Sequence, residues 1–301
     1  MQITLRTAFA AALVASTGTA YAQSAELDGT VSTTDASASA DASASADASA
    51  SVDGAAVDVD ASAAAADAAA DDQFTLPKGK LFIQGIIAMN LSEDQAFKPV
   101  SISPDVFYGV TDDLTLGLVH SGIGATGIIG SVGQSLCVTG EDNGCDQVYN
   151  SVGLDARYRI AAPFAINGGL YVGDFDPFAL QLKAGLIAGH RWGKFGLETN
   201  PNVFFGLTER DTGNKEVLTV PVTASIHASP AFAINAQAGL ITPFSNAGDL
   251  WRLSAAIGAR FRVNEHLDLG LAFALPLLAG GLDDGTGADA RTLTLGVGYA
   301  L

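Results

Sequence analysis

Four histidines and two cysteines are the side chains in this sequence best suited to catalysis or metal binding. His120 is followed by Ser121, which would supply a base beside a nucleophile, but adjacent residues of a strand point to opposite faces and cannot serve one site. His190 and His266 lie beside expected turns, and His227 alone shares the inward parity of its strand. No GxSxG, HExxH or Walker pattern occurs in residues 78–301. We therefore expect no catalytic residues, no metal site, no cofactor and no enzymatic activity.

Cys137 and Cys145 lie close together in the sequence, with seven residues between them. In an exported protein such a pair most simply forms one disulfide within its loop. The acidic residues around them could instead bind Ca²⁺ through oxygen ligands, although their spacing has no EF-hand pattern. The sequence predicts the disulfide, in a loop over 122–148 that we expect to be extracellular and that could also contact a surface partner.

The acidic charge of the chain is concentrated in one segment. The 301 residues carry a formal net charge of -17, and residues 23–72 contain eleven Asp and Glu but no Lys or Arg. From residue 73 onwards, 21 acidic residues face 14 basic ones. Nucleic-acid partners are excluded, because such binding needs clustered basic side chains that neutralise phosphates.

The first 77 residues are expected to lie outside the folded domain. Residues 1–22 have the pattern of a secretory signal peptide, with Arg6 before an apolar run and Ala20-Tyr21-Ala22 as the cleavage site. Residues 23–77 are rich in Ala, Ser and Asp, with too few large apolar side chains to offset the entropy of ordering, so we expect a disordered acidic linker in the periplasm. Binding of a cationic partner or a divalent ion by this linker is the alternative.

Residues 78–301 consist of segments in which apolar residues alternate with small or polar ones. This period of two predicts strands with one apolar face. Twelve strands are expected, near 80–91, 100–110, 114–121, 149–160, 164–173, 178–192, 195–208, 217–228, 232–244, 250–263, 267–278 and 291–301.

The turns between these strands give an independent test, because residues paired across a hairpin share one face of the sheet. Three-residue turns join strands whose apolar residues have the same number parity, as for Val263 and Leu267. The two-residue turn Gly193-Lys194 joins an even face ending at Trp192 to an odd one starting at Phe195. All five short turns keep the apolar face continuous, so the strands are expected to form one up-and-down antiparallel sheet.

The apolar face is expected to contact lipid. Side chains cannot fill the centre of a twelve-stranded barrel, so an apolar face turned inward would leave a void. The opposite face is made of Gly, Ala, Ser, Thr and Asn with few charges. An even number of strands, with short turns alternating with longer loops, is typical of transmembrane barrels. The fold class is therefore all-β, a transmembrane antiparallel up-and-down β-barrel of about 12 strands.

The chain resembles the outer-membrane β-barrel proteins of Gram-negative bacteria. The resemblance rests on the signal sequence, on the regular alternation of strands with short turns and longer loops, and on the last strand, Leu293-Thr-Leu-Gly-Val-Gly-Tyr-Ala-Leu301. This porin-like resemblance covers residues 78–301 and implies outer-membrane lipid as surroundings. It also implies recognition of the last strand by the barrel-assembly machinery, although members usually end in an aromatic residue and this chain ends in Leu301. The group includes porins, specific channels, enzymes and adhesins, so fold alone fixes no function.

Aromatic residues near the strand ends fit the membrane interpretation, because amphipathic rings favour the lipid interface. Those expected in a girdle at the short turns are Tyr108, Tyr158, Phe164, Trp192, Phe195, Phe232, Phe261 and Tyr299. Those expected at the opposite rim are Phe178, Phe205, Phe244 and Trp251.

The charged residues with inward parity are the candidate functional residues. The lumen-lining set is Arg157, Arg159, Lys183, Arg252, Arg260, Arg262, Asp105, Asp155, Glu198 and Asp268. Two interpretations stay open for it. The set could form ion pairs that close a narrow lumen, since buried charges need partners, and the barrel would then be structural or a surface-interaction protein. Alternatively it lines a narrow pore for small solutes with a mild excess of positive charge.

Overall fold

The computed structural model describes residues 74–245, 247–280 and 289–301. The predicted signal peptide and nearly all of the predicted linker lie outside the described residues. Among the described residues, no helix has both the length and the apolar composition needed to cross a bilayer.

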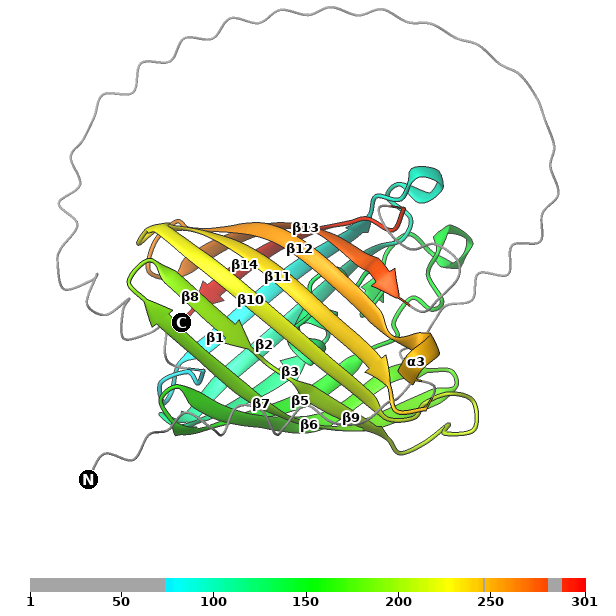
Figure 1. The fold of residues 1–301 in the computed structure, drawn as a ribbon, viewed down its shortest axis with the longest axis horizontal. Coiled ribbons are helices and arrows are strands. Elements are labelled where there is room, and N and C mark those ends of the chain that lie inside the picture. The colour runs from blue at the N-terminus through cyan, green and yellow to red at the C-terminus, as the bar shows by residue number, and fades with distance from the viewer. Residues whose placement is uncertain (1–73, 246, 281–288) are drawn as a thin grey trace, which may run out of the picture.

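Strands form nearly all of the regular structure (Figure 1). They are β1 (Leu81–Asn90), β2 (Val100–Thr111), β3 (Leu114–Val119), β5 (Val152–Ala161), β6 (Phe164–Phe175), β7 (Phe178–Trp192), β8 (Phe195–Thr199), β9 (Asn202–Gly206), β10 (Val217–Ser229), β11 (Phe232–Pro243), β12 (Arg252–Arg262), β13 (Leu267–Gly280) and β14 (Thr292–Ala300). The connections contain the two-residue strand β4 (Leu136–Cys137), the α-helices α2 (Gly122–Thr126) and α3 (Ala247–Leu250), and the 3-10 helices η1 (Glu93–Gln95) and η2 (Glu141–Asn143).

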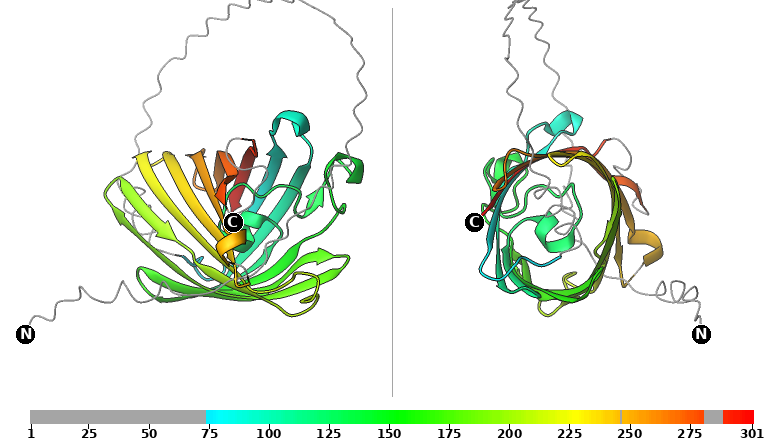
Figure 2. Two further views of the ribbon diagram at one scale, coloured as in Figure 1. Left: turned by 45° about the vertical axis from the view of Figure 1, so that its right-hand side comes forward. Right: turned by 90° about the vertical axis from the view of Figure 1, so that its left-hand side faces the viewer.

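The sheet closes into a barrel, because β1 pairs antiparallel with both β2 and β14 (Figure 2). Strands β8 and β9 both pair with β7 and β10, and together they form one crossing strand interrupted at Asn200 and Pro201. Proline has no N–H to donate to a neighbouring strand, which accounts for the break. The described residues thus form a twelve-stranded up-and-down barrel, as the sequence predicts.

The strand registers follow from the turn lengths. Arg262 pairs with Asp268 across the β12–β13 turn, as expected for its three-residue turn. The β5–β6 and β10–β11 turns are tighter than expected, because a bulge pairs Ala161 with Phe164 and Ser229 with Phe232, and the expected register holds beyond each bulge. The two-residue turn pairs Trp192 with Phe195. All five short turns lie at the end of the barrel where β1 begins and β14 ends, which we name the turn end. The opposite end, with the remaining connections, is the loop end.

Large apolar side chains are exposed on the outside of the barrel. On β13, Leu269, Leu271 and Phe273 point outward while Gly270 and Ala272 point inward. All eight aromatic residues of the predicted girdle at the turn end are at least one-third exposed, and so are Phe178 and Phe205 at the loop end. An exposed apolar belt of this extent requires lipid around it. This closed ring with an apolar outer surface is the fold of outer-membrane β-barrels.

Most strand ends differ from the sequence expectation by up to three residues, and β3 and β5 are examples of strands that are shorter at the loop end. Strand β3 ends at Val119 rather than at residue 121, because Ser121 becomes the N-cap of α2 and accepts a hydrogen bond of 2.8 Å from the Gly124 N–H. Strand β5 begins at Val152 rather than at 149.

Candidate functional site

The connection between β3 and β5 folds into the barrel. Its helix α2 lies inside the ring of strands (Figure 2, right). On the wall, the inward residues Tyr171, Phe204 and Val217 form one apolar cluster with Ala125 of α2. We define residues 121–134 as the inserted loop. The expectation of a wholly extracellular loop over 122–148 is therefore corrected: burial of Ala125 and Ile128 against the wall places the first half inside.

The inserted loop is also hydrogen-bonded to side chains of β9 and β11, which lie across the barrel from β3, where the loop begins. The amide of Gln237 on β11 donates from Nε2 to the Gly127 carbonyl at 2.9 Å, and its Oε1 accepts from the Ile129 N–H at 2.7 Å. Asn202 on β9 approaches the Thr126 carbonyl from Nδ2 at 3.4 Å. Side chains from separate strands thus satisfy the backbone of a loop that would otherwise carry buried unpaired polar groups.

Asp105 anchors the beginning of the inserted loop. Its Oδ1 accepts hydrogen bonds from the backbone N–H groups of His120, at 2.7 Å, and Ser121, at 2.9 Å, and the Ser121 hydroxyl donates to Oδ2. The residue has no exposed surface. Asp105 points inward as its parity predicts, but it lies beneath the inserted loop and holds that loop in place.

Asp155 joins two cations in the barrel interior. Its carboxylate accepts from Lys183 Nζ at 2.7 Å and from Arg157 Nε at 3.1 Å. The Arg157 guanidinium also lies 4.7 Å from the centre of the Phe107 ring, a cation–π contact. The side chains of Asp155 and Lys183 are 2% and 4% exposed, so this ion pair is buried in the wall.

A second carboxylate is shared at the turn end. Arg260 Nη2 lies 2.6 Å from Asp268 Oδ2, and Arg262 Nε lies 3.5 Å from Oδ1 of the same residue. Arg159 instead pairs at 2.6 Å with Asp113 in the β2–β3 turn, an acid outside the predicted set. At the turn end, one arginine is thus paired with an acid of a turn and two share a single carboxylate. The arginines at this end outnumber the carboxylates that point inward near them.

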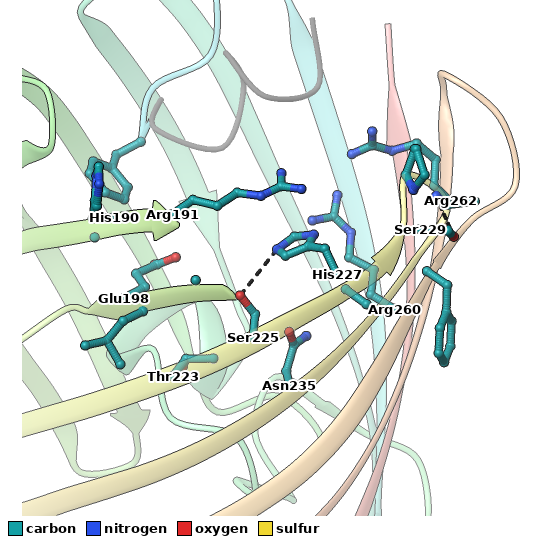
Figure 3. A pocket seen from close by; sticks show the side chains of 18 residues that line it. His190, Arg191, Glu198, Thr223, Ser225, His227, Ser229, Asn235, Arg260 and Arg262 are labelled. Atoms are coloured by element: carbon teal, nitrogen blue, oxygen red, sulfur yellow. Dashed lines mark hydrogen bonds between the residues drawn. The ribbon is translucent and has the colours of Figure 1, made fainter. Parts of the chain in front are cut away.

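A cavity of about 210 Å³ opens at the turn end of the lumen. Arg191, Arg260 and His227 point into the same space (Figure 3). Arg262 and Glu198, both predicted to line the lumen, also belong to its wall. The three arginines Arg191, Arg260 and Arg262 outnumber the two carboxylates beside them, Glu198 in the wall and Asp268 paired with Arg260 and Arg262, which gives this opening a net positive charge, and we name it the cationic mouth.

Arg191 is a lumen residue that the sequence analysis left out. Its odd number on β7 matches that of Lys183, while the outward Trp192 is even, so the same alternation could have found it. Within the mouth, Ser225 Oγ lies 3.3 Å from His227 Nε2. The remaining predicted lumen residue, Arg252, lies near the other end of β12, where it pairs with Gly280.

One side of the lumen is lined by very small residues. On β12, β13 and β14 the inward positions include Gly270, Gly296, Ala256 and Ala272. A Cβ built on Gly270 or Gly296 would meet no atom closer than 3.9 Å. The inserted loop therefore does not fill the space in front of these two glycines.

The connection between β9 and β10, over 207–216, is attached to the loop end of the barrel through Asn214. Asn214 is fully buried and donates from Nδ2 to the Thr208 carbonyl at 2.7 Å and to the Leu180 carbonyl at 3.0 Å. Arg210 lies 2.6 Å from Glu216, and its hydrogen bond holds the pKa of the Glu216 carboxyl below the usual range. Asn214 thus fixes this connection to β7 at the loop end, where its side chain also accepts from Gln181 Nε2 at 2.7 Å.

The two cysteines form the predicted disulfide, with Cα atoms 5.8 Å apart. Cys137 lies on β4, which pairs with β2, so the bond fixes the outer half of the β3–β5 connection to the rim of the barrel. Among residues 74–245, 247–280 and 289–301, no three His, Cys, Asp or Glu side chains lie close enough to hold a metal ion.

We expect Cys137 and Cys145 to resist a thiol-reactive maleimide in the native oxidised protein and to react after reduction, because both sulfurs are covalently paired. Mass spectrometry of the labelled protein measures this directly. Since the chain has no other cysteine, the reduced protein is its own positive control. Labelling before reduction would contradict the disulfide.

Comparisons with known proteins show similarity of overall structure alone. No protein-family model and no curated protein matches the chain. Among solved structures, the KdgM porin is 9% identical, with a TM-score of 0.47 over 72% of this chain and 98% of that one. The NanC porin is 10% identical, with a TM-score of 0.46 over 73% and 100%. An outer membrane channel from Pseudomonas putida F1 is 11% identical, with a TM-score of 0.47 over 76% and 98%. These TM-scores are below 0.5, and the similarity assigns no solute.

Proposed function

We propose that this protein is a narrow channel of the outer membrane for small solutes, with a weak preference for anions. The observation that carries the proposal is the cationic mouth together with the unfilled wall at Gly270 and Gly296. A mouth lined by Arg191, Arg260 and Arg262 concentrates anions, and the small-residue wall leaves a path beside the inserted loop. The protein performs no catalysis in this proposal and needs no cofactor.

The orientation follows from the connections. Short turns and both chain ends of outer-membrane barrels lie in the periplasm, so the turn end faces the periplasm and the loop end faces outward. Residues 1–22 would direct export of the chain and then be removed, the linker over 23–77 would lie in the periplasm, and the barrel-assembly machinery would engage β14. These assignments form part of the proposal.

A closed structural or surface-interaction barrel is the second candidate. The inserted loop favours it, because hydrogen bonds from Gln237 and Asn202 hold that loop across the lumen. The two candidates differ in one measurement: a channel passes ions in a planar bilayer and a closed barrel is silent. A lipid-modifying enzyme, the third and weakest alternative, would instead turn over phospholipid or lipopolysaccharide in detergent micelles.

We expect Gly270→Leu to lower single-channel conductance by roughly a factor of two or more, because the new side chain enters the unfilled part of a narrow lumen. Gly85→Leu is the matched control. Gly85 lies on the lipid face beside Ile83 and Ile87, and a Cβ there meets nothing within 4 Å. Equal conductance of the wild type and Gly270→Leu would show that ions do not pass this wall.

We expect weak anion selectivity at low salt that fades as ionic strength rises, because screening shortens to about 8 Å near physiological salt. Replacing Arg157, Arg159 and Arg260 with Gln should move the reversal potential toward cations. Replacing the cations Lys98, Arg210 and Lys215 with Gln makes the same change in charge at the loop end, outside the lumen, and should move the reversal potential less. A wild type that remains electrically silent, with a triple Arg variant that is only less stable, would favour the closed barrel.

A further inference from the structure

The chain immediately before β1 lies inside the turn end of the barrel. Phe74 belongs to the wall of the cationic mouth. Thr75 is 4% exposed and donates from Oγ1 to the Asp112 carbonyl at 2.9 Å. The Leu76 N–H donates at 2.7 Å to Oγ1 of Thr115, an inward residue of β3. We name residues 74–77 the anchor segment.

The strands are shaped to receive the anchor segment. A Cβ on Gly109 would lie 2.1 Å from the Pro77 carbonyl oxygen and 2.7 Å from that of Leu76, so only glycine allows the chain to pass over β2 at this point. On the other side of the mouth, a Cβ on Gly189 would lie 3.1 Å from the Phe74 ring. The anchor segment therefore occupies a defined place between two walls of the lumen.

The residues before the anchor segment are strongly acidic. Asp71 and Asp72 precede Phe74 by three and two residues, a stretch that spans at most about 11 Å of extended chain. The eleven acidic residues of 23–72 carry no basic residue among them. The cationic mouth, in contrast, carries the arginines Arg191, Arg260 and Arg262 against the two carboxylates Glu198 and Asp268, a net positive charge. The charge of this segment is thus complementary to the opening in which its C-terminal end is fixed.

We propose that the acidic segment 23–72 binds the cationic mouth of its own barrel and there competes with anionic solutes. Attachment through Phe74 makes the binding intramolecular, with an effective concentration in the millimolar range for a short tether, so weak ion pairs suffice. The attraction is screened by salt, and the segment acts as a tethered competitor whose strength depends on ionic strength. Binding of the segment stands independently of the proposed channel function, whereas the competition with solutes rests on it.

A distance measurement tests the binding. Spin labels are placed at Ala56→Cys in the acidic segment and Pro230→Cys in the exposed β10–β11 turn of the full-length mature protein in lipid nanodiscs. The native cysteines are paired and take no label. If the segment is unbound, the 18 residues between Ala56 and Phe74 would separate these two positions by roughly 25 Å on average, and the distance between the two labels would have a broad distribution. At 10 mM salt we expect a shorter mean distance between the labels and a narrower distribution, and at 1 M salt we expect the mean to lengthen and the distribution to broaden.

Two variants separate charge pairing from other causes. Replacing every Asp of 23–72 with Asn and Glu26 with Gln leaves the barrel untouched and should give the broad distribution at both salt concentrations. The triple variant Arg191→Gln, Arg260→Gln and Arg262→Gln removes the positive charge of the mouth. It should also give the broad distance distribution at both salt concentrations. A wild-type distribution that is identical at the two salt concentrations, or that the neutral segment leaves unchanged, would overturn the proposal.

Conductance tests the competition. In planar bilayers at low salt, the barrel with the neutral segment should conduct anions roughly twofold or more better than the wild type, and the difference should vanish at 1 M salt. Equal anion conductance at low salt would overturn the competition. If both proteins are silent, the channel function fails, and the spin-label distances still decide whether the segment binds the mouth.

Discussion

Leu271→Arg is expected to prevent the barrel from assembling in a membrane. Leu271 lies in the middle of β13, points outward and is 50% exposed on the apolar belt. A cation on the lipid face near the midplane costs roughly 2–4 kcal/mol. This is a large part of the stability of a marginally stable fold. Folding into lipid vesicles, followed by the shift in gel mobility without heating, measures the loss.

Gly270→Arg is the matched control for this prediction. It places the same side chain one residue away on the same strand, but on the lumen face, where a Cβ meets nothing closer than 3.9 Å. We expect this variant to assemble. Normal insertion of Leu271→Arg together with failure of Gly270→Arg would mean that the two faces of the sheet are reversed.

Asp155→Asn is expected to lower the free energy of unfolding by about 3–5 kcal/mol, because it leaves a buried cation without its counter-charge. Lys183 is 4% exposed and lies 2.7 Å from Asp155, which also accepts from Arg157. Urea unfolding in lipid vesicles measures the change.

Two further variants test the cause of this loss. The double variant Asp155→Asn with Lys183→Met removes both charges and should recover much of the stability, which would make the two substitutions non-additive. Asp113→Asn breaks the pair with Arg159 in the turn, where the Asp113 side chain is 53% exposed, and should cost no more than about 1 kcal/mol. Equal losses for Asp155→Asn and Asp113→Asn would contradict a buried ion pair.

The sequence by itself determined the barrel, its registers and its two faces. A period of two is a local property of each strand, and a short turn transmits it to the next, so the pairing of Arg262 with Asp268 followed from counting residues. The outward girdle and the inward parity of Lys183 followed in the same way, and Arg191 could have been included by the same rule.

Only the tertiary structure decided how the lumen is occupied. The inserted loop depends on contacts such as that between Ile129 and Gln237, 108 residues apart in the chain, and no local pattern encodes which wall a loop will meet. For the same reason, the sequence could not show that Asp105 anchors this loop, or that the anchor segment enters the cationic mouth. Strand pairing repeats along the backbone, whereas the filling of a lumen depends on which side chains from distant strands meet in the space that the closed barrel creates.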